Sequence, residues 1–285
     1  MPELLKLLRP KQWVKNAFVL APLFFSLQFD NINRLSLALL ACLVFIASSS
    51  IIYIINDIND AQEDRKHPRK KHRPIASGHV SVTAALWLLV PLGTIVALGL
   101  LLLPVTCTFI ICGYVIVNLL YSRILKHIAI IDVLVIASGF VLRLLMGGYA
   151  IGVQLSSWII ASTFLLALFI GFGKRHQELS VSGYQDVRES LRGYNLELLN
   201  RFITISCTSA LLCYTLYTVE TGRILGKPSL VYTTVFVVFG LFRYLQRIYL
   251  DKEGGEPETI ILYDPLFISN GILWLLSVWW VLSHG

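Results

Sequence analysis

Long apolar stretches dominate this sequence and limit what it can fold into. A helix needs about 20 apolar residues to cross the hydrocarbon core of a bilayer. Hydrophobic residues make up 56% of the 285 residues and charged residues only 14%, which is unlike a soluble domain. The apolar stretches lie at residues 16–29, 35–56, 81–101, 104–122, 129–150, 156–173, 200–219, 229–248 and 261–283. The sequence therefore predicts an integral membrane protein with nine transmembrane helices.

The same stretches predict an all-α fold. Backbone groups in hydrocarbon must be hydrogen-bonded within the protein, and these stretches lack the alternating pattern of barrel strands. Because no linker is long enough to separate domains, we expect one transmembrane domain over residues 1–285. No small-residue cleavage pattern follows the basic N-terminus, so we expect that segment to be retained. The five cysteines lie in apolar runs without metal-ligand spacing and are interpreted as small core residues: Cys42, Cys107, Cys112, Cys207 and Cys213.

Basic residues are unevenly distributed among the short connections. The first fifteen residues contain four Lys or Arg, residues 57–79 contain six, and the connections after the fourth, sixth and eighth predicted helices are also basic. The intervening connections contain few. Since Lys and Arg concentrate on the cytoplasmic side, we expect an inner (plasma) membrane protein with a cytoplasmic N-terminus and an external C-terminus.

A polar stripe lies at the end of the second predicted helix. Asn56, Asp60 and Asp64 recur every four residues, which places them on one helical face, with Tyr53 one turn earlier. Oxygen-bearing side chains on one stripe repel each other unless a cation lies between them. Mg²⁺ suits this arrangement, because it is usually held by one or two carboxylates together with substrate phosphate oxygens.

An alternative interpretation needs no metal. The acidic side chains would then pair with the basic residues that follow, Arg65, Lys66 and Arg69. Against this interpretation, Asn56 and Asp57 begin the stripe inside an apolar span, where polar side chains are costly and are candidates for function.

This segment resembles the first signature of the UbiA-type intramembrane prenyltransferases, Asn-Asp-x-x-Asp-x-x-x-Asp. The match is complete at Asn56, Asp57, Asp60 and Asp64, and the trailing Arg-Pro-Ile-Ala-Ser-Gly from Arg73 also fits. The segment Tyr-Ser-Arg-Ile-Leu-Lys at residues 121–126 resembles the family's Tyr and Lys signature. The resemblance covers essentially the whole chain and agrees with the family's nine-helix bundle.

One departure from the family pattern narrows the resemblance to a branch. Ordinary members carry a second acidic cluster after the sixth helix, where this chain has Lys174, Arg175 and His176. Basic residues there suit a second phosphate that is bound without metal. Together with Leu-Arg-Pro-Lys-Gln-Trp at residues 8–13 and Ser-Leu-Arg-Gly-Tyr at 190–194, this is similar to the decaprenyl-phosphate phosphoribosyltransferase branch.

The resemblance implies a role for each matching residue. Asn56 and Asp60 would ligate Mg²⁺, and Asp57, Asp60 and Asp64 form the catalytic set. Lys174 and Arg192 would bind the lipid phosphate, although both would also be ordinary as basic loop residues. Phosphoribosyl diphosphate would contact Lys15, Tyr53, Lys70, Lys126 and Arg143.

Arg143 lies deep in the fifth apolar stretch, where an unpaired guanidinium is costly. A substrate phosphate would compensate its charge. The alternative is a pair with Asp132, but three helical turns separate these residues in sequence.

The implied reaction transfers 5-phosphoribosyl from phosphoribosyl diphosphate to a polyprenyl phosphate for cell-envelope glycan synthesis. A lipid phosphate is already ionised near neutral pH, so no histidine is assigned as a general base. The alternatives are an aromatic prenyltransferase of quinone or haem biosynthesis and a non-enzymatic lipid-binding or transport protein. Nucleic acid is not expected as a partner, because the basic residues are spread over loops next to the membrane. The oligomeric state, the acceptor chain length and direct metal ligation by Asp57 and Asp64 stay open.

Overall fold

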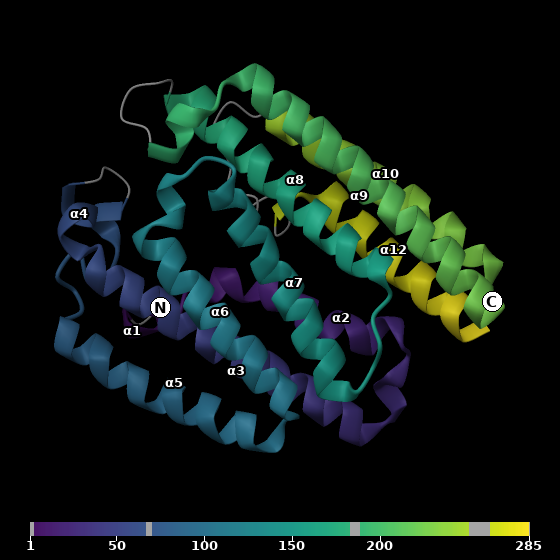
Figure 1. The fold of residues 1–285 in the computed structure, drawn as a ribbon, viewed down its shortest axis with the longest axis horizontal. Helices are drawn as coiled ribbons and strands as arrows, with labels where there is room; N and C mark the ends of the chain where they lie inside the picture. Colours follow the sequence, from purple (N-terminus) through teal and green to yellow (C-terminus); the bar gives the residue numbers. More distant parts are fainter. Residues whose placement is uncertain (1–2, 67–69, 183–188, 251–262, 285) are drawn as a thin grey trace. The chain divides into compact units, whose positions relative to one another are not determined.

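The structure is a computed structural model that describes residues 3–66, 70–182, 189–250 and 263–284. These residues form helices and connections, with no strand among them (Figure 1). Eight helices are long and apolar enough to cross a membrane, so the chain is a multi-pass membrane protein. Seven of them are α3 (Ile32–Asn59), α5 (Val82–Leu102), α6 (Val105–Arg123), α7 (Ile131–Ile151), α8 (Ser157–Ser182), α9 (Leu196–Leu225) and α12 (Pro265–His284). The eighth span, Pro228–Leu250, joins η6 (Pro228–Thr233) to α10 (Thr234–Leu250).

The first predicted span, residues 16–29, is not one helix, so the described chain has eight such helices rather than nine. It is divided among short pieces, of which α2 (Ala17–Phe25) has nine residues and covers roughly 14 Å at 1.5 Å per residue. Pro22 removes a backbone donor inside α2, and Leu27 turns the chain at a φ of 50°. The stretch also includes the last residue of η1 (Pro10–Asn16) and the start of η2 (Gln28–Asp30), and α1 (Glu3–Leu7) precedes it.

The N-terminal pieces nevertheless run along α3 in the opposite direction. In the second half of α3, Ser50 Oγ donates to the Leu8 carbonyl at 3.3 Å. In the first half, Cys42 Sγ donates to the Asn16 carbonyl at 3.7 Å. Asn31 then caps the start of α3 by accepting from two backbone N–H groups. The segment before α3 therefore follows that helix over much of its length without being one continuous helix.

The described residues group into two compact units. The first comprises the described parts of Met1–Leu23, Gln28–Ser122 and Arg143–Val153, and the second those of Phe24–Leu27, Arg123–Leu142 and Gln154–Gly285. Helix α7 contributes its first half to the second unit and its second half to the first. In the first unit α3 packs against α5, and in the second α8 packs along α9.

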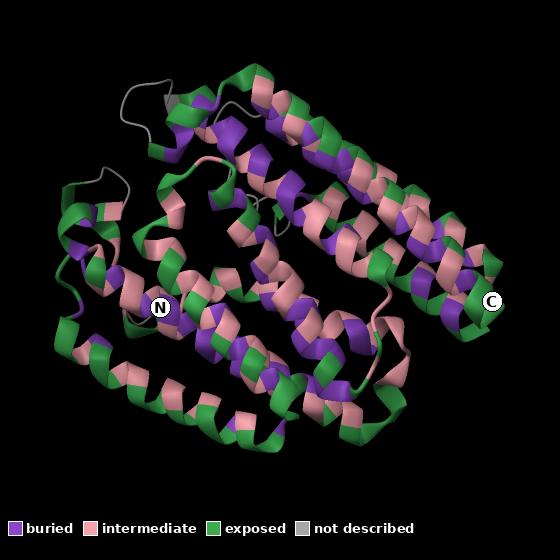
Figure 2. Cartoon of the chain, in the orientation of Figure 1, coloured by how far each residue is buried: buried purple, intermediate pink, exposed green. Residues whose placement is uncertain are grey.

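The outward faces of both units are apolar. In the first unit Trp87 and Leu101 of α5 are 72% and 80% exposed, and in the second Trp280 of α12 is 60% exposed. Figure 2 shows α5 mostly as exposed and intermediate residues, whereas α3 carries many buried ones. Such faces suit lipid rather than water. All five cysteines are free, but Cys112 is exposed on α6, so its prediction as a core residue is wrong.

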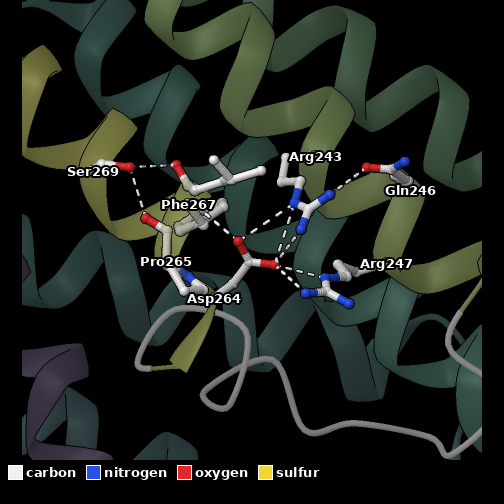
Figure 3. Close-up of polar contacts among 8 residues, drawn as sticks. Arg243, Gln246, Arg247, Asp264, Pro265, Phe267 and Ser269 are labelled. Carbon is white, nitrogen blue, oxygen red and sulfur yellow. Dashed lines mark hydrogen bonds and ion pairs between the residues drawn. The ribbon is translucent and has the colours of Figure 1, made fainter.

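An ion-pair cluster joins α10 to the start of α12 in the second unit (Figure 3). The buried Asp264 carboxylate accepts from Arg243 Nη2 at 2.9 Å and from Arg247 Nη2 at 2.6 Å. It also accepts the Phe267 backbone N–H at 3.0 Å and thereby caps α12. This one side chain therefore fixes where α12 begins relative to α10.

Candidate active site

The polar stripe of the first unit lies where α3 passes into α4 (Ala61–Lys66). Asp60 stands between the two helices with a φ of −87° and a ψ of 0°. Its N–H donates to the Asn56 carbonyl at 2.8 Å, and the Asp64 N–H donates to the Asp60 carbonyl at 2.8 Å. Because this helical bonding pattern continues through Asp60, the side chains of Asn56, Asp60 and Asp64 follow one another turn by turn.

Two of the acids bind arginines. Asp57 and Asp64 are 3% and 2% exposed, respectively. Arg73 Nη1 lies 3.2 Å from Asp57 Oδ1 and 2.6 Å from Asp64 Oδ2, and so bridges the two carboxylates. Arg9 Nη2 lies 2.5 Å from Asp57 Oδ1. Lys70 Nζ lies 3.9 Å from Asp64 Oδ1, which places this predicted donor-binding residue at the cluster.

These partners differ from the ones expected in the metal-free interpretation. Arg65 Nε donates to the Ala76 carbonyl at 3.1 Å, and Arg69 lies outside the described residues. The arginines that hold Asp57 come from positions 48 residues before it and 16 residues after it. Asp57 and Asp64 thus have arginine partners, Arg9 and Arg73, that the metal-free interpretation did not name.

Arg9 was not predicted as a site residue. Its backbone is left-handed, at φ 50° and ψ 62°, a conformation that costs a non-glycine residue about 1 kcal/mol. Its guanidinium lies 4.9 Å from the centroid of the Tyr53 ring, so Tyr53 and Asp57 together fix its position. Backbone strain that is held by surrounding contacts is typical of functional sites. Arg9 and Arg73 both occur in the motifs quoted above, but their contacts with the acids are not visible in the sequence.

The donor set of the stripe suits a divalent cation that arrives with phosphate. Asn56 Oδ1 accepts from Ser122 Oγ at 2.7 Å, and the half-buried Asp60 carboxylate follows one turn later. In the described part of the chain, no three His, Cys, Asp or Glu side chains gather as a metal site would require. Mg²⁺ does not need such a cage, because it is commonly held by one or two protein oxygens together with substrate phosphates and water. The residues fit that mode of binding.

Arg143 is buried in the first unit at 5% exposure. Its Nε donates to Asn16 Oδ1 at 2.8 Å, and its guanidinium lies 4.7 Å from the centroid of the Phe45 ring and 5.3 Å from that of Tyr114. These three partners are uncharged and help to orient the guanidinium. The alternative prediction, a pair between Arg143 and Asp132, is not among these contacts.

Asp132 is instead bound within the second unit. It is fully buried, and its two oxygens accept from Arg175 Nε at 2.8 Å and from Tyr194 Oη at 3.0 Å. Burial raises the pKa of Tyr194, so its hydroxyl keeps the proton that it donates. Arg175 Nη1 also lies 2.6 Å from Glu178 Oε2. Arg175 is therefore already held by two carboxylates, although its sequence position suggested part of a phosphate-binding cluster.

The other predicted basic residues divide between the units. Lys15 of η1, Tyr53, Lys70 and Arg143 belong to the first unit, whereas Lys126 belongs to the second. Lys174 lies on α8, half-buried, and Arg192 is exposed in η5 (Glu189–Gly193). The first unit thus contains the acid stripe and four of the predicted donor-binding residues, and the second contains the predicted lipid phosphate-binding residues and Lys126.

The sequence model of the UbiA prenyltransferase family matches residues 17–271. The chain belongs to this family. Among curated relatives of this UbiA family member, the decaprenyl-phosphate phosphoribosyltransferase of Mycobacterium tuberculosis is 32% identical, over 98% of this chain and 94% of the relative. The enzyme of the same name from Corynebacterium glutamicum is 32% identical, over 96% of this chain and 85% of the relative.

Solved structures of the family share the fold. A UbiA homologue from Archaeoglobus fulgidus, bound to GPP and Mg²⁺, superposes with a TM-score of 0.73 at 17% identity, covering 99% of each chain. The apo structure of a homologue from Aeropyrum pernix superposes with a TM-score of 0.66 at 16% identity, over 93% of this chain and 98% of that one. The predicted all-α membrane fold of the UbiA type is thereby confirmed.

Proposed function

We propose that this protein transfers the 5-phosphoribosyl group from phosphoribosyl diphosphate to a polyprenyl phosphate, releases diphosphate, and so supplies a precursor of a cell-envelope glycan. The observation that carries the proposal is the similarity, over nearly the whole chain, to decaprenyl-phosphate phosphoribosyltransferases. The chemistry of the side chains supports it. The first unit contains an acid stripe with adjoining cations, and the second has basic residues where ordinary family members have acids.

The first unit supplies the donor site in this proposal. Asn56 and Asp60 would hold Mg²⁺, which when bound neutralises diphosphate charge and orients the donor. Asp57 and Asp64 support the site by holding Arg9 and Arg73 next to it. Tyr53 positions Arg9. The cations that would contact phosphate oxygens are Arg9, Lys15, Lys70, Arg73 and Arg143.

The acceptor would bind to the second unit through charge-assisted hydrogen bonds from Lys174 and Arg192. Lys126 would contact the donor. As diphosphate departs, the ribosyl C1 gains oxocarbenium character and a phosphate oxygen of the lipid attacks its opposite face. The attacking oxygen is already ionised, so catalysis consists of positioning and charge stabilisation, without a histidine base.

The proposed location is the plasma membrane, with the basic loops in the cytoplasm, where the water-soluble donor is found. Basic residues concentrate in alternate connections, as the positive-inside rule requires for that orientation. The exposed apolar faces of α5 and α12 would contact the lipid tails among which the acceptor resides.

A donor-specificity assay tests the proposal. Purified protein supplied with Mg²⁺, labelled phosphoribosyl diphosphate and a polyprenyl phosphate is expected to form a lipid-linked ribose phosphate. The Asp60→Ala variant should abolish the product, whereas Glu63→Ala, an exposed acid three residues further on, should retain it. No product with this donor, but alkylation of an aromatic acceptor by a prenyl diphosphate, would favour an aromatic prenyltransferase instead.

A further inference from the structure

The second unit contains a buried polar cluster centred on Asp132, in the first turn of α7. Asp132 is 0% exposed, and both of its oxygens are bound, one to Arg175 of α8 and one to Tyr194, just after η5. A buried ion pair contributes little net stability compared with apolar packing, because both charges must be removed from water. Asp132 instead fixes the positions of α7, α8 and the residue after η5 relative to one another, although these segments are far apart in sequence.

Tyr194 links this cluster to the connection before α7. Its hydroxyl accepts the Ile130 backbone N–H at 2.5 Å while donating to Asp132. Ile130 has a φ of 69°, which is strained for a β-branched residue. The strained turn is therefore held by a hydroxyl that is itself held by a buried carboxylate.

The segment η5 packs closely on the same connection. A Cβ added at Gly193 would lie 2.6 Å from the Ala129 Cβ, so only glycine allows this approach. On the outer side, His127 Nδ1 lies 2.8 Å from Glu189 Oε2. η5, which carries Arg192, is thus held against η4 (Leu125–His127), which carries Lys126.

The third segment is the C-terminal part of α8. Arg175 is 2% exposed, and its guanidinium is oriented by Asp132 on one side and Glu178 on the other. The neighbouring residue Lys174 is half-buried on the same turn. Each segment held by the Asp132 cluster therefore carries one basic residue of the second unit: Lys126, Lys174 or Arg192.

From this geometry we propose that Asp132, Arg175 and Tyr194 are positioning residues that set Lys174 and Arg192 in register for binding a phosphate group on a lipid. This inference rests on the proposed function and deepens it. It assigns Arg175 and Tyr194 to a supporting role that their place in the basic motifs does not reveal.

The test compares binding of farnesyl phosphate with binding of farnesol by calorimetry on the purified protein. Both probes have the same prenyl chain, so their difference reports on the phosphate alone. Tyr194→Phe removes one hydroxyl and keeps the ring, and it is expected to weaken farnesyl phosphate binding by about 10-fold without changing farnesol binding. The matched control is Tyr249→Phe in the same unit, which removes a partly exposed hydroxyl bound to Asn200 Oδ1 and should change neither.

A double-mutant cycle separates positioning from a general loss of structure. If Tyr194 acts through Arg192, combining Tyr194→Phe with Arg192→Gln should weaken binding by less than the product of the two single effects. Asp132→Asn is a second variant that disrupts the cluster, because it keeps the shape of the carboxylate and removes its charge. It should weaken farnesyl phosphate binding as Tyr194→Phe does.

The outcomes are distinct. If the wild-type protein does not prefer farnesyl phosphate to farnesol, both the proposed acceptor and this inference are overturned. If Arg192→Gln loses the preference but Tyr194→Phe and Asp132→Asn retain it, the positioning role is wrong and the proposed function stands. If the double variant weakens binding by the full product of the two single effects, the positioning role is also overturned.

Discussion

At the scale of single residues, Asp57 and Asp60 are three positions apart but differ in their surroundings. Asp57 is buried and accepts hydrogen bonds from Arg9 and Arg73. Asp60 is half-buried and is the residue that connects the end of α3 to the start of α4. We expect Asp57→Asn to lower the free energy of unfolding by roughly 1–3 kcal/mol, because two guanidiniums lose a carboxylate partner.

Asp60→Asn should reduce turnover, because it removes a charged ligand of the proposed Mg²⁺. The measurement is thermal denaturation of both purified variants beside the transferase assay. Equal melting temperatures for Asp57→Asn and wild type would contradict the anchoring role of Asp57.

Local spacing made part of this site predictable. The recurrence of Asn56, Asp60 and Asp64 follows from helical geometry alone, and the hydrogen bonds through Asp60 preserve it. The pairs that complete the site do not follow from spacing. Arg9 reaches Asp57 across 48 residues, and Arg175 reaches Asp132 across 43. Such contacts depend on how helices pack, which a single sequence does not encode in any local pattern.

At the scale of elements, α7 lies against the N-terminal pieces without room for a side chain. A Cβ on Gly147 would lie 1.9 Å from the Val19 carbonyl oxygen, and backbone cannot move aside as a flexible side chain can. We expect Gly147→Ala to destabilise the protein by at least about 1–3 kcal/mol.

The control is Gly93→Ala in α5, where nothing lies within 4 Å of the added carbon. Since alanine favours a helix by roughly 0.5–1 kcal/mol, this variant should be as stable as wild type or more so. Melting temperatures in detergent measure both. Similar melting temperatures for the two variants would show that α7 does not approach Val19 so closely.

The junction of α10 and α12 makes a prediction about pH. Burial alone would raise the pKa of Asp264, but bonds from Arg243, from the Phe267 N–H and from Arg247 hold it at about 2. Because this pKa is lower than the unfolded value of 3.8, the carboxylate stabilises the fold above that value, and the stabilisation is lost as pH falls towards 2.

Wild type should therefore melt above Asp264→Asn at neutral pH, and the difference should shrink between about pH 4 and pH 2. Thermal denaturation across that range measures it, with Asp30→Asn, an exposed acid of η2, as the control. A difference that is constant over the whole range would show that the charge of Asp264 does not stabilise the junction.

Element boundaries show why apolar length alone overcounts the helices. Pro91 lies inside α5, and that helix continues for 21 residues, whereas the stretch around Pro22 is divided into short pieces. Both stretches look alike in hydropathy. The difference arises at Leu27, whose positive φ ends the run, and at η1, where the polar residues Lys15 and Asn16 lie beside α3. Hydropathy therefore located the apolar stretches, but it did not show which of them form one continuous helix.

At the scale of the whole molecule, the topology depends on whether the N-terminal pieces cross the membrane. Leu8 lies beside Ser50 and Asn16 beside Cys42, so the segment runs along α3 against its direction. Followed by the eight long helices, such a crossing puts the two termini on opposite sides. If the pieces stayed at one surface, both termini would lie on the same side.

Cysteine labelling distinguishes these topologies. In a background with the five native cysteines replaced by alanine, single cysteines at Lys6, Lys71 and Ser283 would be treated with a membrane-impermeant maleimide. All three positions are exposed on the protein. In intact cells we expect only the Ser283→Cys variant to react, and in inverted vesicles only Lys6→Cys and Lys71→Cys. Because the basic loops define the cytoplasmic side, labelling of Lys71→Cys from outside would reverse the whole orientation, and labelling of Lys6→Cys together with Ser283→Cys would show that the segment before α3 does not cross.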